Sequence, residues 1–225
     1  MIKFEKTDVS GWEAAIRGMR NPLESWDKSD SHQDYYDFGH GRPAKFIIGP
    51  NDLKLMQNLA KAGDDHAKYL RMINVTCDIT APLYWWKEFD TYKVGTVANS
   101  CSTMHKIHAK PFDYEDFSID HLLCDKNYFD YYDLKDCNAF TAFNVTLTAL
   151  NFYREKFIET KDKDFWWQMI QLLPSSYNQK RTVQLNYQVL HNMYKSRKNH
   201  KLDEWREFCK WCESLPYFKE ILLNE

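Results

Sequence analysis

The chain has 225 residues, enough for one domain with a sizeable core, and 44% of them are hydrophobic and 16% aromatic. This composition excludes a disordered or low-complexity protein. The 30 Lys and Arg residues nearly balance the 32 Asp and Glu residues, and no basic stripe with interleaved aromatics appears. We therefore expect no duplex nucleic acid among the partners.

No apolar run approaches the roughly 20 residues that a membrane helix needs, and residues 1–6 lack a signal-peptide core. We therefore predict a cytoplasmic protein with no membrane partner. The cysteines are scattered along the chain, which favours free thiols over a disulfide scaffold. They are Cys77, Cys101, Cys124, Cys137, Cys209 and Cys212.

The first elements are a strand over residues 1–9 and a helix over 11–19, where apolar residues recur at helical spacing. Residues 20–43 then become polar, aromatic and rich in Gly and Pro. This stretch is typical of a long functional loop or an insertion, and residues 26–32 are candidates for a lid or pocket wall, although a solvated loop has the same composition. We expect a single domain over residues 1–225 that carries this insertion.

The middle of the chain predicts a helix, a strand and a second helix. Asn51 can cap a helix that Gly63 ends. Apolar and polar residues alternate over 73–80, which indicates a half-buried strand. Pro82 then begins a helix with aromatic residues at helical spacing. These are Trp85, Trp86, Phe89 and Tyr92.

The remainder of the chain is predicted to be helical, with breaks at Pro174 and near residues 199–200. The predicted helices cover residues 138–159, 165–173, 178–196 and 202–214, with a short tail at 216–223. No internal repeat is present. Strands and helices together indicate an α/β (α+β) fold class.

The stretch from Ala81 to Lys93 resembles the segment that introduces the signature of flavin-dependent thymidylate synthases (ThyX), A-P-x-x-x-x-R-Q-x-x-R-H-R. The family pattern continues with x-x-S-x-N-E-x-S-x-R. This chain offers Thr96, Asn99, Ser100, Ser102 and Met104 if one residue is inserted near Ala98.

A second region shares the spacing of the family's carboxy-terminal helix. Leu173 and Pro174 are followed by Asn186, Asn192 and Arg197 in the pattern L-P-x(11)-N-x(5)-[HN]-x(4)-R. The two regions cover about a third of the chain. The resemblance implies a ThyX-like fold, with a central mixed or antiparallel sheet flanked by long helices.

The resemblance also implies a reaction, in which reduced FAD supplies hydride and methylenetetrahydrofolate supplies one carbon to a pyrimidine nucleotide. NADPH is the further cofactor of such a reaction, and a homotetramer with sites between subunits is the implied assembly. The alternative is a non-catalytic nucleotide-binding protein on the same fold. A third reading is a globular protein whose ancestral pocket is unused.

The family's flavin-binding R-H-R falls on Thr91, Tyr92 and Lys93, which keeps one cation and one aromatic hydrogen-bonding group. On the family pattern, Asn186 and Asn192 direct amides to the same cofactor from one helix. Without that pattern, both are ordinary capping or surface residues.

The family's substrate positions fall on Glu88, Ser100, Ser102 and Arg197, and Glu88 and Arg197 are the candidate catalytic residues. Two family arginines are replaced by Met104 and Ile170, and each loss removes roughly 1.5–3 kcal/mol of charge-assisted binding. A carboxylate at Glu88 would favour an amino-bearing base edge such as that of cytosine. Its alternative role is an ion pair with Lys87 or Lys93 on a solvated helix face.

Three further patterns have a structural and a functional interpretation. Cys101, His105 and His108 could hold zinc, although no fourth ligand is evident and plain loop residues are the commoner case, so no metal is assigned. Cys209 and Cys212 follow an apolar helical stripe and are expected in the core. The pairs Trp85-Trp86 and Trp166-Trp167 are expected to be packing residues.

Overall fold

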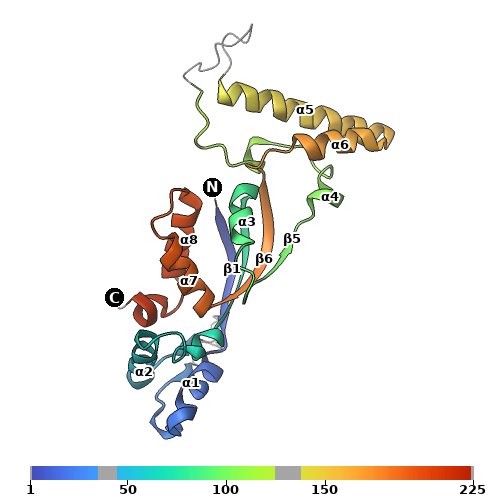
Figure 1. Ribbon diagram of the computed structural model, residues 1–225. Helices are drawn as coiled ribbons and strands as arrows, with labels where there is room; N and C mark the ends of the chain where they lie inside the picture. Colours follow the sequence, from blue (N-terminus) through green and yellow to red (C-terminus); the bar gives the residue numbers. More distant parts are fainter. Residues whose placement is uncertain (1, 35–44, 125–137, 224–225) are drawn as a thin grey trace. The chain divides into compact units, whose positions relative to one another are not determined.

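We describe a computed structural model of the chain over residues 2–34, 45–124 and 138–223. It contains both strands and helices, in agreement with the expected α/β fold class (Figure 1). The strands are β1 (Lys3–Ser10), β2 (His32–Asp34), β3 (Lys45–Ile47), β4 (Asn74–Pro82), β5 (Val97–Ser100) and β6 (Asn178–Asn186). The helices are α1 (Trp12–Arg20), α2 (Pro50–Lys61), α3 (Leu83–Phe89), α4 (Thr103–Lys106), α5 (Ala139–Thr160), α6 (Lys163–Leu172), α7 (Tyr187–Arg197) and α8 (Asp203–Glu213).

Four strands pair in the order β1-β4-β6-β5, and β2 pairs with β3 in a separate antiparallel ladder. The chain divides into two compact units. Unit 1 contains Met1–Lys3, Ile79–Thr91 and Asn99–Arg181, and unit 2 contains Phe4–Asp78, Tyr92–Ala98 and Thr182–Glu225. Both units draw on separated stretches of the chain, and the single domain over residues 1–225 stays a prediction.

Strand β4 follows the alternation in its sequence. Ile73 just before it and Val75, Cys77 and Ile79 within it are at most 1% exposed, whereas Thr76 is exposed. The apolar side chains therefore share one face, as period-two packing requires. This confirms the strand predicted over residues 73–80.

Helix α3 begins directly after Pro82, which occupies the N-cap position, and its Trp85, Trp86 and Phe89 are buried. Trp86 Nε1 donates a hydrogen bond of 2.9 Å to the Gln179 carbonyl. The two tryptophans are thus packing residues, as expected. The helix ends at Phe89, so Tyr92 lies outside the helix that was predicted to include it.

The helix predicted over residues 178–196 is wrong in its first half, because residues 178–186 form strand β6 and only then does α7 begin. The overlooked signal is a short alternation that leaves Gln179, Val183 and Leu185 buried. Pairing with β4 and β5 satisfies the backbone of this segment, and tertiary pairing of this kind overrides a weak helical pattern.

The start of α2 also differs from expectation. The helix begins at Pro50, and Asn51 lies inside it without capping it. The cap is supplied by Asp30, whose carboxylate accepts the backbone N–H groups of Asn51 at 2.9 Å and Asp52 at 3.1 Å. Gly63 follows the helix with φ +104°, consistent with its predicted role in ending it.

A buried ion pair organises the described part of the 20–43 segment. Arg20 Nε donates to Asp52 Oδ1 at 2.7 Å, and Ser29 and Ser31 donate to Asp52 Oδ2 at 2.8 and 2.7 Å. Burial would raise the Asp52 pKa, but the hydrogen bonds from Ser31, Ser29 and Arg20 together lower it. Residues 20–31 are thus fixed by side-chain bonds. Residues 35–43 lie outside the described chain, and the lid or pocket-wall role stays a prediction.

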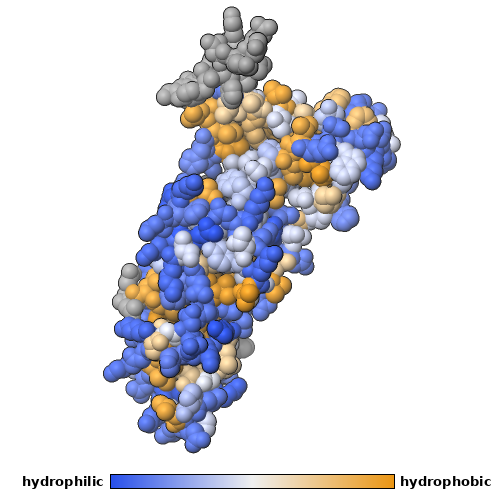
Figure 2. All heavy atoms as spheres, viewed as in Figure 1, coloured by the Kyte–Doolittle hydropathy of each residue, from blue (hydrophilic) through white to orange (hydrophobic). Residues whose placement is uncertain are grey.

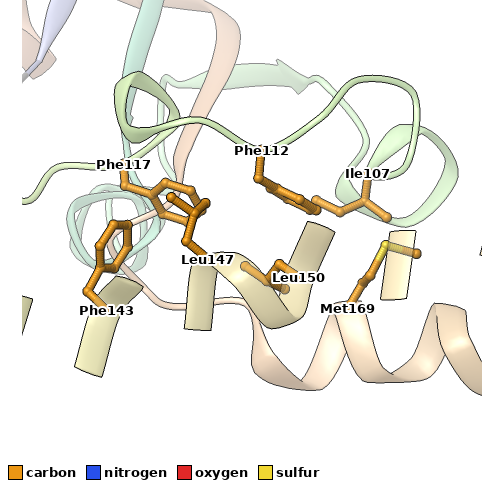
Figure 3. Packing of buried hydrophobic residues seen from close by; sticks show 7 residues of the cluster. All are labelled: Ile107, Phe112, Phe117, Phe143, Leu147, Leu150 and Met169. Carbon is orange, nitrogen blue, oxygen red and sulfur yellow. The ribbon is translucent and has the colours of Figure 1, made fainter. Parts of the chain in front are cut away.

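Helices α5 and α6 pack together around the apolar core of unit 1 (Figure 3). Its buried members are Ile107, Phe112, Phe117, Phe143, Leu147, Leu150 and Met169. Asn138 caps α5 by accepting the Thr141 N–H at 2.8 Å. The helices predicted over residues 138–159 and 165–173 are therefore confirmed.

Helix α8 confirms the predicted apolar stripe, since Trp205, Phe208, Cys209 and Cys212 are all buried. Burial raises the pKa of the Cys209 thiol to about 11, so this thiol stays protonated. All cysteines in the described chain are free thiols, as predicted, and Cys137 lies outside it. No helix in the described ranges is long and apolar enough to cross a membrane.

Candidate functional site

In unit 2, a fixed arginine lies at the end of α7. Arg197 Nε donates a hydrogen bond of 2.9 Å to the Tyr92 hydroxyl. The guanidinium carbon lies 4.6 Å from the ring centroid of Trp205 and 5.5 Å from that of Tyr92. Stacking on two rings restricts the orientation of the charge, which favours recognition of a planar or anionic group. We call Tyr92, Arg197 and Trp205 the Arg197 cluster.

The opposite end of α7 carries a second predicted residue, Asn186. Its side-chain oxygen accepts the Val189 N–H at 3.0 Å and caps the helix. Asn186 and Arg197 are eleven residues apart, which is about three helical turns, so they lie on the same side of α7. One face of this helix thus carries an amide at its start and a cation at its end.

A glycine brings the loop after Tyr92 against the start of α7. Gly95 has φ +76°, and a Cβ there would lie 2.9 Å from Val189 Cγ2 and 3.2 Å from Asn186 Nδ2. Residues 92–95 therefore extend from Arg197 to Asn186, and Lys93 on this loop is exposed. The loop therefore places Tyr92 beside Arg197 at the end of α7 and Gly95 beside Asn186 at its start, with Lys93 between them in the sequence.

Asn192 belongs to a different group on α7. It is exposed, and its side-chain oxygen accepts a hydrogen bond of 3.3 Å from Gln188, which also donates to Asp64 at 3.2 Å. The six residues between Asn186 and Asn192 turn the helix by about 240°, so the two amides face different directions. The sequence interpretation overlooked Gln188 and Asp64 because single polar residues carry no periodic signal.

In unit 1, strand β6 carries a second arginine that is stacked on an aromatic ring. Arg181 carries its guanidinium carbon 4.2 Å from the Trp86 ring centroid, and one terminal nitrogen lies 2.7 Å from Asp90 Oδ1. Its Nε donates to Gln179 Oε1 at 2.9 Å. We call Trp86, Asp90, Gln179 and Arg181 the Arg181 cluster. Sequence reasoning missed it, because Arg181 was placed in a helix.

The predicted substrate loop is tied to this cluster. Gln179 Nε2 donates to the Cys101 carbonyl at 2.8 Å, and the Cys101 N–H donates to the Lys180 carbonyl at 2.9 Å. Cys101 lies between the exposed Ser100 and Ser102. The Ser102 hydroxyl accepts the His105 N–H at 3.0 Å and caps α4.

Other predicted residues fall on either side of the boundary between the units. Glu88 and Thr91 belong to unit 1, where Thr91 donates its hydroxyl to the Glu88 carbonyl at 2.7 Å. Tyr92 and Lys93 belong to unit 2, as does Arg197. The predicted catalytic pair, Glu88 and Arg197, is therefore divided between the two units.

Met104 and Ile170, which replace two arginines of the family pattern, have apolar side chains and offer no charge to a ligand. Met104 is 47% exposed, and its carbonyl accepts a hydrogen bond of 3.1 Å from Trp166 Nε1. Ile170 packs against the apolar core of unit 1. In the described parts of the chain, no three His, Cys, Asp or Glu side chains gather as metal ligands.

Solved structures of low sequence identity share this architecture over nearly their whole length. Thymidylate synthase X (ThyX) from Helicobacter pylori with FAD and dUMP aligns with a TM-score of 0.65, at 15% identity, over 99% of this chain and 97% of the other. This chain has the ThyX fold. A second structure of the Helicobacter pylori enzyme with FAD and dUMP gives the same TM-score over 98% of its length.

The ThyX fold also includes the UMP/dUMP methylase PolB from Streptomyces cacaoi bound with 5-Br dUMP. It aligns with a TM-score of 0.62, at 13% identity, over 100% of this chain and 95% of the other. No protein-family model and no curated protein sequence matches the chain. The resemblance to the ThyX fold found in the sequence is thus confirmed by three-dimensional structure.

Proposed function

We propose that the chain is a divergent, flavin-dependent enzyme of the thymidylate synthase type that acts on a pyrimidine nucleotide. The observation that carries the proposal is the extent of the fold match, which leaves at most 5% of the chain of each of these three structures uncovered. All three neighbours are bound to a pyrimidine nucleotide, and two of them also to FAD.

The residues present fit a polyanionic flavin. Lys93 offers an exposed ammonium, Tyr92 a hydroxyl and Asn186 an amide, and Gly95 lets the loop approach α7 closely. Thr91 is a further residue that we assign to the cofactor, whereas Asn192 is not retained there, because its amide faces a different direction from that of Asn186. When bound, reduced FAD supplies hydride, while methylenetetrahydrofolate supplies the carbon and NADPH reduces the flavin.

The chain's own contribution is positioning and electrostatics. Arg197, held by Tyr92 and Trp205, orients the nucleotide through a charge-assisted contact. Ser100 and Ser102 offer hydroxyls on an exposed loop. Glu88 accepts hydrogen bonds from the base, and we propose that it favours the amino edge of cytosine over the carbonyl edge of uracil.

The first test is the absorbance of the purified protein between 350 and 500 nm, before and after incubation with FAD. A bound flavin spectrum is expected. Thermal-shift titration with dUMP, UMP, dCMP and CMP then identifies the base, and a larger shift with uridine nucleotides would contradict the role of Glu88. A protein that binds neither flavin nor any pyrimidine nucleotide would overturn the proposal.

A second candidate is a nucleotide-binding protein without catalysis. The apolar surroundings of Ile170 favour it, because a family cation is missing there. The two functions differ in one measurement, the release of tritium from a nucleotide labelled at C5 in the presence of FAD, NADPH and methylenetetrahydrofolate. Release indicates the enzyme, and nucleotide binding without release indicates the binding protein.

We also propose a homotetramer, located in the cytoplasm, where pyrimidine nucleotides and reduced cofactors are available. An apolar face of α5 supports self-association. Residues 139–153 carry no charged side chain, and Val145 and Phe152 on this stretch are 66% and 51% exposed. Thr141, Asn144, Val145, Thr148, Ala149, Phe152 and Tyr153 line a hollow of about 560 Å³ there, and Figure 2 shows hydrophobic surface gathered over α5. Exposed apolar surface of this kind is typical of interfaces.

A further inference from the structure

We propose that Arg181 forms the phosphate subsite of the nucleotide site, in place of the two arginines whose positions are occupied by Met104 and Ile170. The inference rests on the proposed function, because it assigns the anionic group of the same ligand. A phosphate monoester needs a fixed cation with several N–H donors, and arginine is suited to this because its planar fork donates two parallel hydrogen bonds.

Arg181 is fixed in orientation before any ligand arrives. Its guanidinium is stacked 4.2 Å from the Trp86 ring centroid, and Trp86 is itself buried and bonded to the Gln179 carbonyl. Gln179 in turn accepts from Arg181 Nε at 2.9 Å. A preorganised donor loses less entropy when it binds an anion than a flexible surface lysine does.

Arg181 is also close to the hydroxyl-bearing loop. The Gln179 side chain bonds to Arg181 Nε through its oxygen and to the Cys101 carbonyl through its nitrogen. One amide group therefore links the guanidinium to the loop that carries Ser100 and Ser102. Serine hydroxyls beside a stacked arginine provide the mixed donor set that phosphate oxygens accept.

The current partner of Arg181 is replaceable. Asp90 lies at 2.7 Å from a terminal nitrogen but is 53% exposed, whereas the Arg181 side chain is 14% exposed. Because the Asp90 carboxylate is half exposed, it can turn into solvent, and a dianionic phosphate can then take over its contact with the guanidinium. Asp90 therefore acts as a competing anion that occupies the subsite in the absence of ligand.

The test is calorimetric titration of the full-length protein with dUMP, dCMP, their nucleosides and inorganic phosphate. We expect Arg181→Met to weaken nucleoside monophosphate binding by about 10- to 100-fold and to leave nucleoside binding unchanged, because only the phosphate contact is lost. Arg181→Lys, which keeps the charge but not the fork, should be intermediate. Asp90→Asn should tighten monophosphate binding several-fold.

The matched control is Lys87→Met, which removes one exposed positive charge from the same unit. An equal loss in Lys87→Met and Arg181→Met would overturn the subsite, because it would indicate a general charge effect. Unchanged monophosphate binding in Arg181→Met would overturn it as well. If Arg181→Met does not fold, Asp90→Asn decides, and unchanged or weaker monophosphate binding in that variant rejects the subsite.

Two other outcomes distinguish a failure of the proposed function from a failure of the nucleotide assignment. Wild-type protein that binds no pyrimidine nucleotide, with or without FAD, overturns the proposed function and the subsite with it. Inorganic phosphate that binds as tightly as the nucleotides, with the same loss in Arg181→Met, overturns the nucleotide assignment and leaves a site for free phosphate.

Discussion

Arg197 is the residue whose surroundings best match a predicted role. The sequence pattern named it through its spacing from Asn186, and the structure supplies Tyr92 and Trp205 as its partners. Trp205 is buried, so the arginine is stacked on the core of unit 2 and not on a mobile surface ring. An arginine held in this way presents its charge in one direction, which is what a positioning role requires.

Replacing Arg197 with Met should weaken nucleotide binding by about 10- to 100-fold, because a charge-assisted contact contributes roughly 1.5–3 kcal/mol. Isothermal titration calorimetry measures the dissociation constant. Lys195→Met removes one exposed charge from the same helix and serves as the control. If both variants bind equally well, Arg197 does not contact the nucleotide.

Because the His191 side chain is partly buried, we expect the stability of the protein to depend on pH. Burial lowers its pKa from 6.5 to about 4, with a smaller contribution in the same direction from Lys195 and an opposing one from Asp64. Between pH 6.5 and 4 the unfolded chain therefore binds a proton that the folded chain does not. The unfolding free energy should fall by about 2 kcal/mol as the pH drops through this window, less than the full shift implies because the ring is partly exposed.

Urea denaturation at pH 7, 5.5 and 4 measures this loss, with His191→Gln as the comparison. The variant should lose less stability over this range than the wild-type protein, because it lacks the titrating ring. Parallel pH profiles for the two proteins would show that other groups cause the effect.

At the scale of elements, α2, α5 and α7 begin where distant or local side chains cap them. Asp30 caps α2 from 21 positions earlier in the chain, whereas Asn186 and Asn138 each cap the helix that follows them. Local caps can be recognised in the sequence, because the capping residue is adjacent to the helix. A cap from a separate loop has no such signal.

Gly49→Ala tests the cap from Asp30. A Cβ at Gly49 would lie 2.2 Å from Asp30 Cγ and 2.5 Å from the Asp30 carbonyl oxygen, so Asp30 must move with its backbone, and its carboxylate then releases the α2 N–H groups. We expect a loss of about 1–2 kcal/mol in unfolding free energy. Gly18→Ala is the control, since its Cβ meets only the flexible Met72 side chain at 3.1 Å and alanine favours the helix. Equal effects of the two substitutions would contradict this explanation.

Asn186 combines a capping role with a proposed role in flavin binding, and substitutions can separate the two. Asn186→Ser keeps an acceptor for the cap but removes the amide, so it should retain stability and bind FAD more weakly. Asn186→Ala should also lose about 1 kcal/mol of stability. Asn138→Ala, at the cap of α5, should lower stability without changing the FAD dissociation constant measured by fluorescence. Unchanged FAD affinity in both Asn186 variants would remove Asn186 from the flavin site.

At the scale of the whole molecule, the apolar face of α5 stands out, because its opposite face already packs into the core of unit 1. Phe143, Leu147 and Leu150 are buried, whereas Val145 and Phe152 remain exposed. A helix that is apolar on two sides is typical of an element covered by a partner.

If the proposed tetramer forms through this face, Val145→Glu with Phe152→Glu should shift the protein toward smaller species, because two charges would be buried without partners. Size-exclusion chromatography with light scattering measures the mass. Leu172→Glu, at a 41% exposed position on α6, is the matched control. A wild-type monomer, or an unchanged mass in the double variant, would reject this interface.

By itself the sequence determined the elements with strong local periodicity, which are β4 and α8, and the kinship of the fold through the spacing of Asn186 and Arg197. Only the tertiary structure decided that residues 178–186 form a strand, that Asp30 caps α2, and that Arg181 stacks on Trp86. The physical reason is the separation along the chain of the residues that interact. Periodicity is a property of neighbouring residues, whereas sheet pairing, remote caps and stacked charges depend on contacts between segments far apart in the chain.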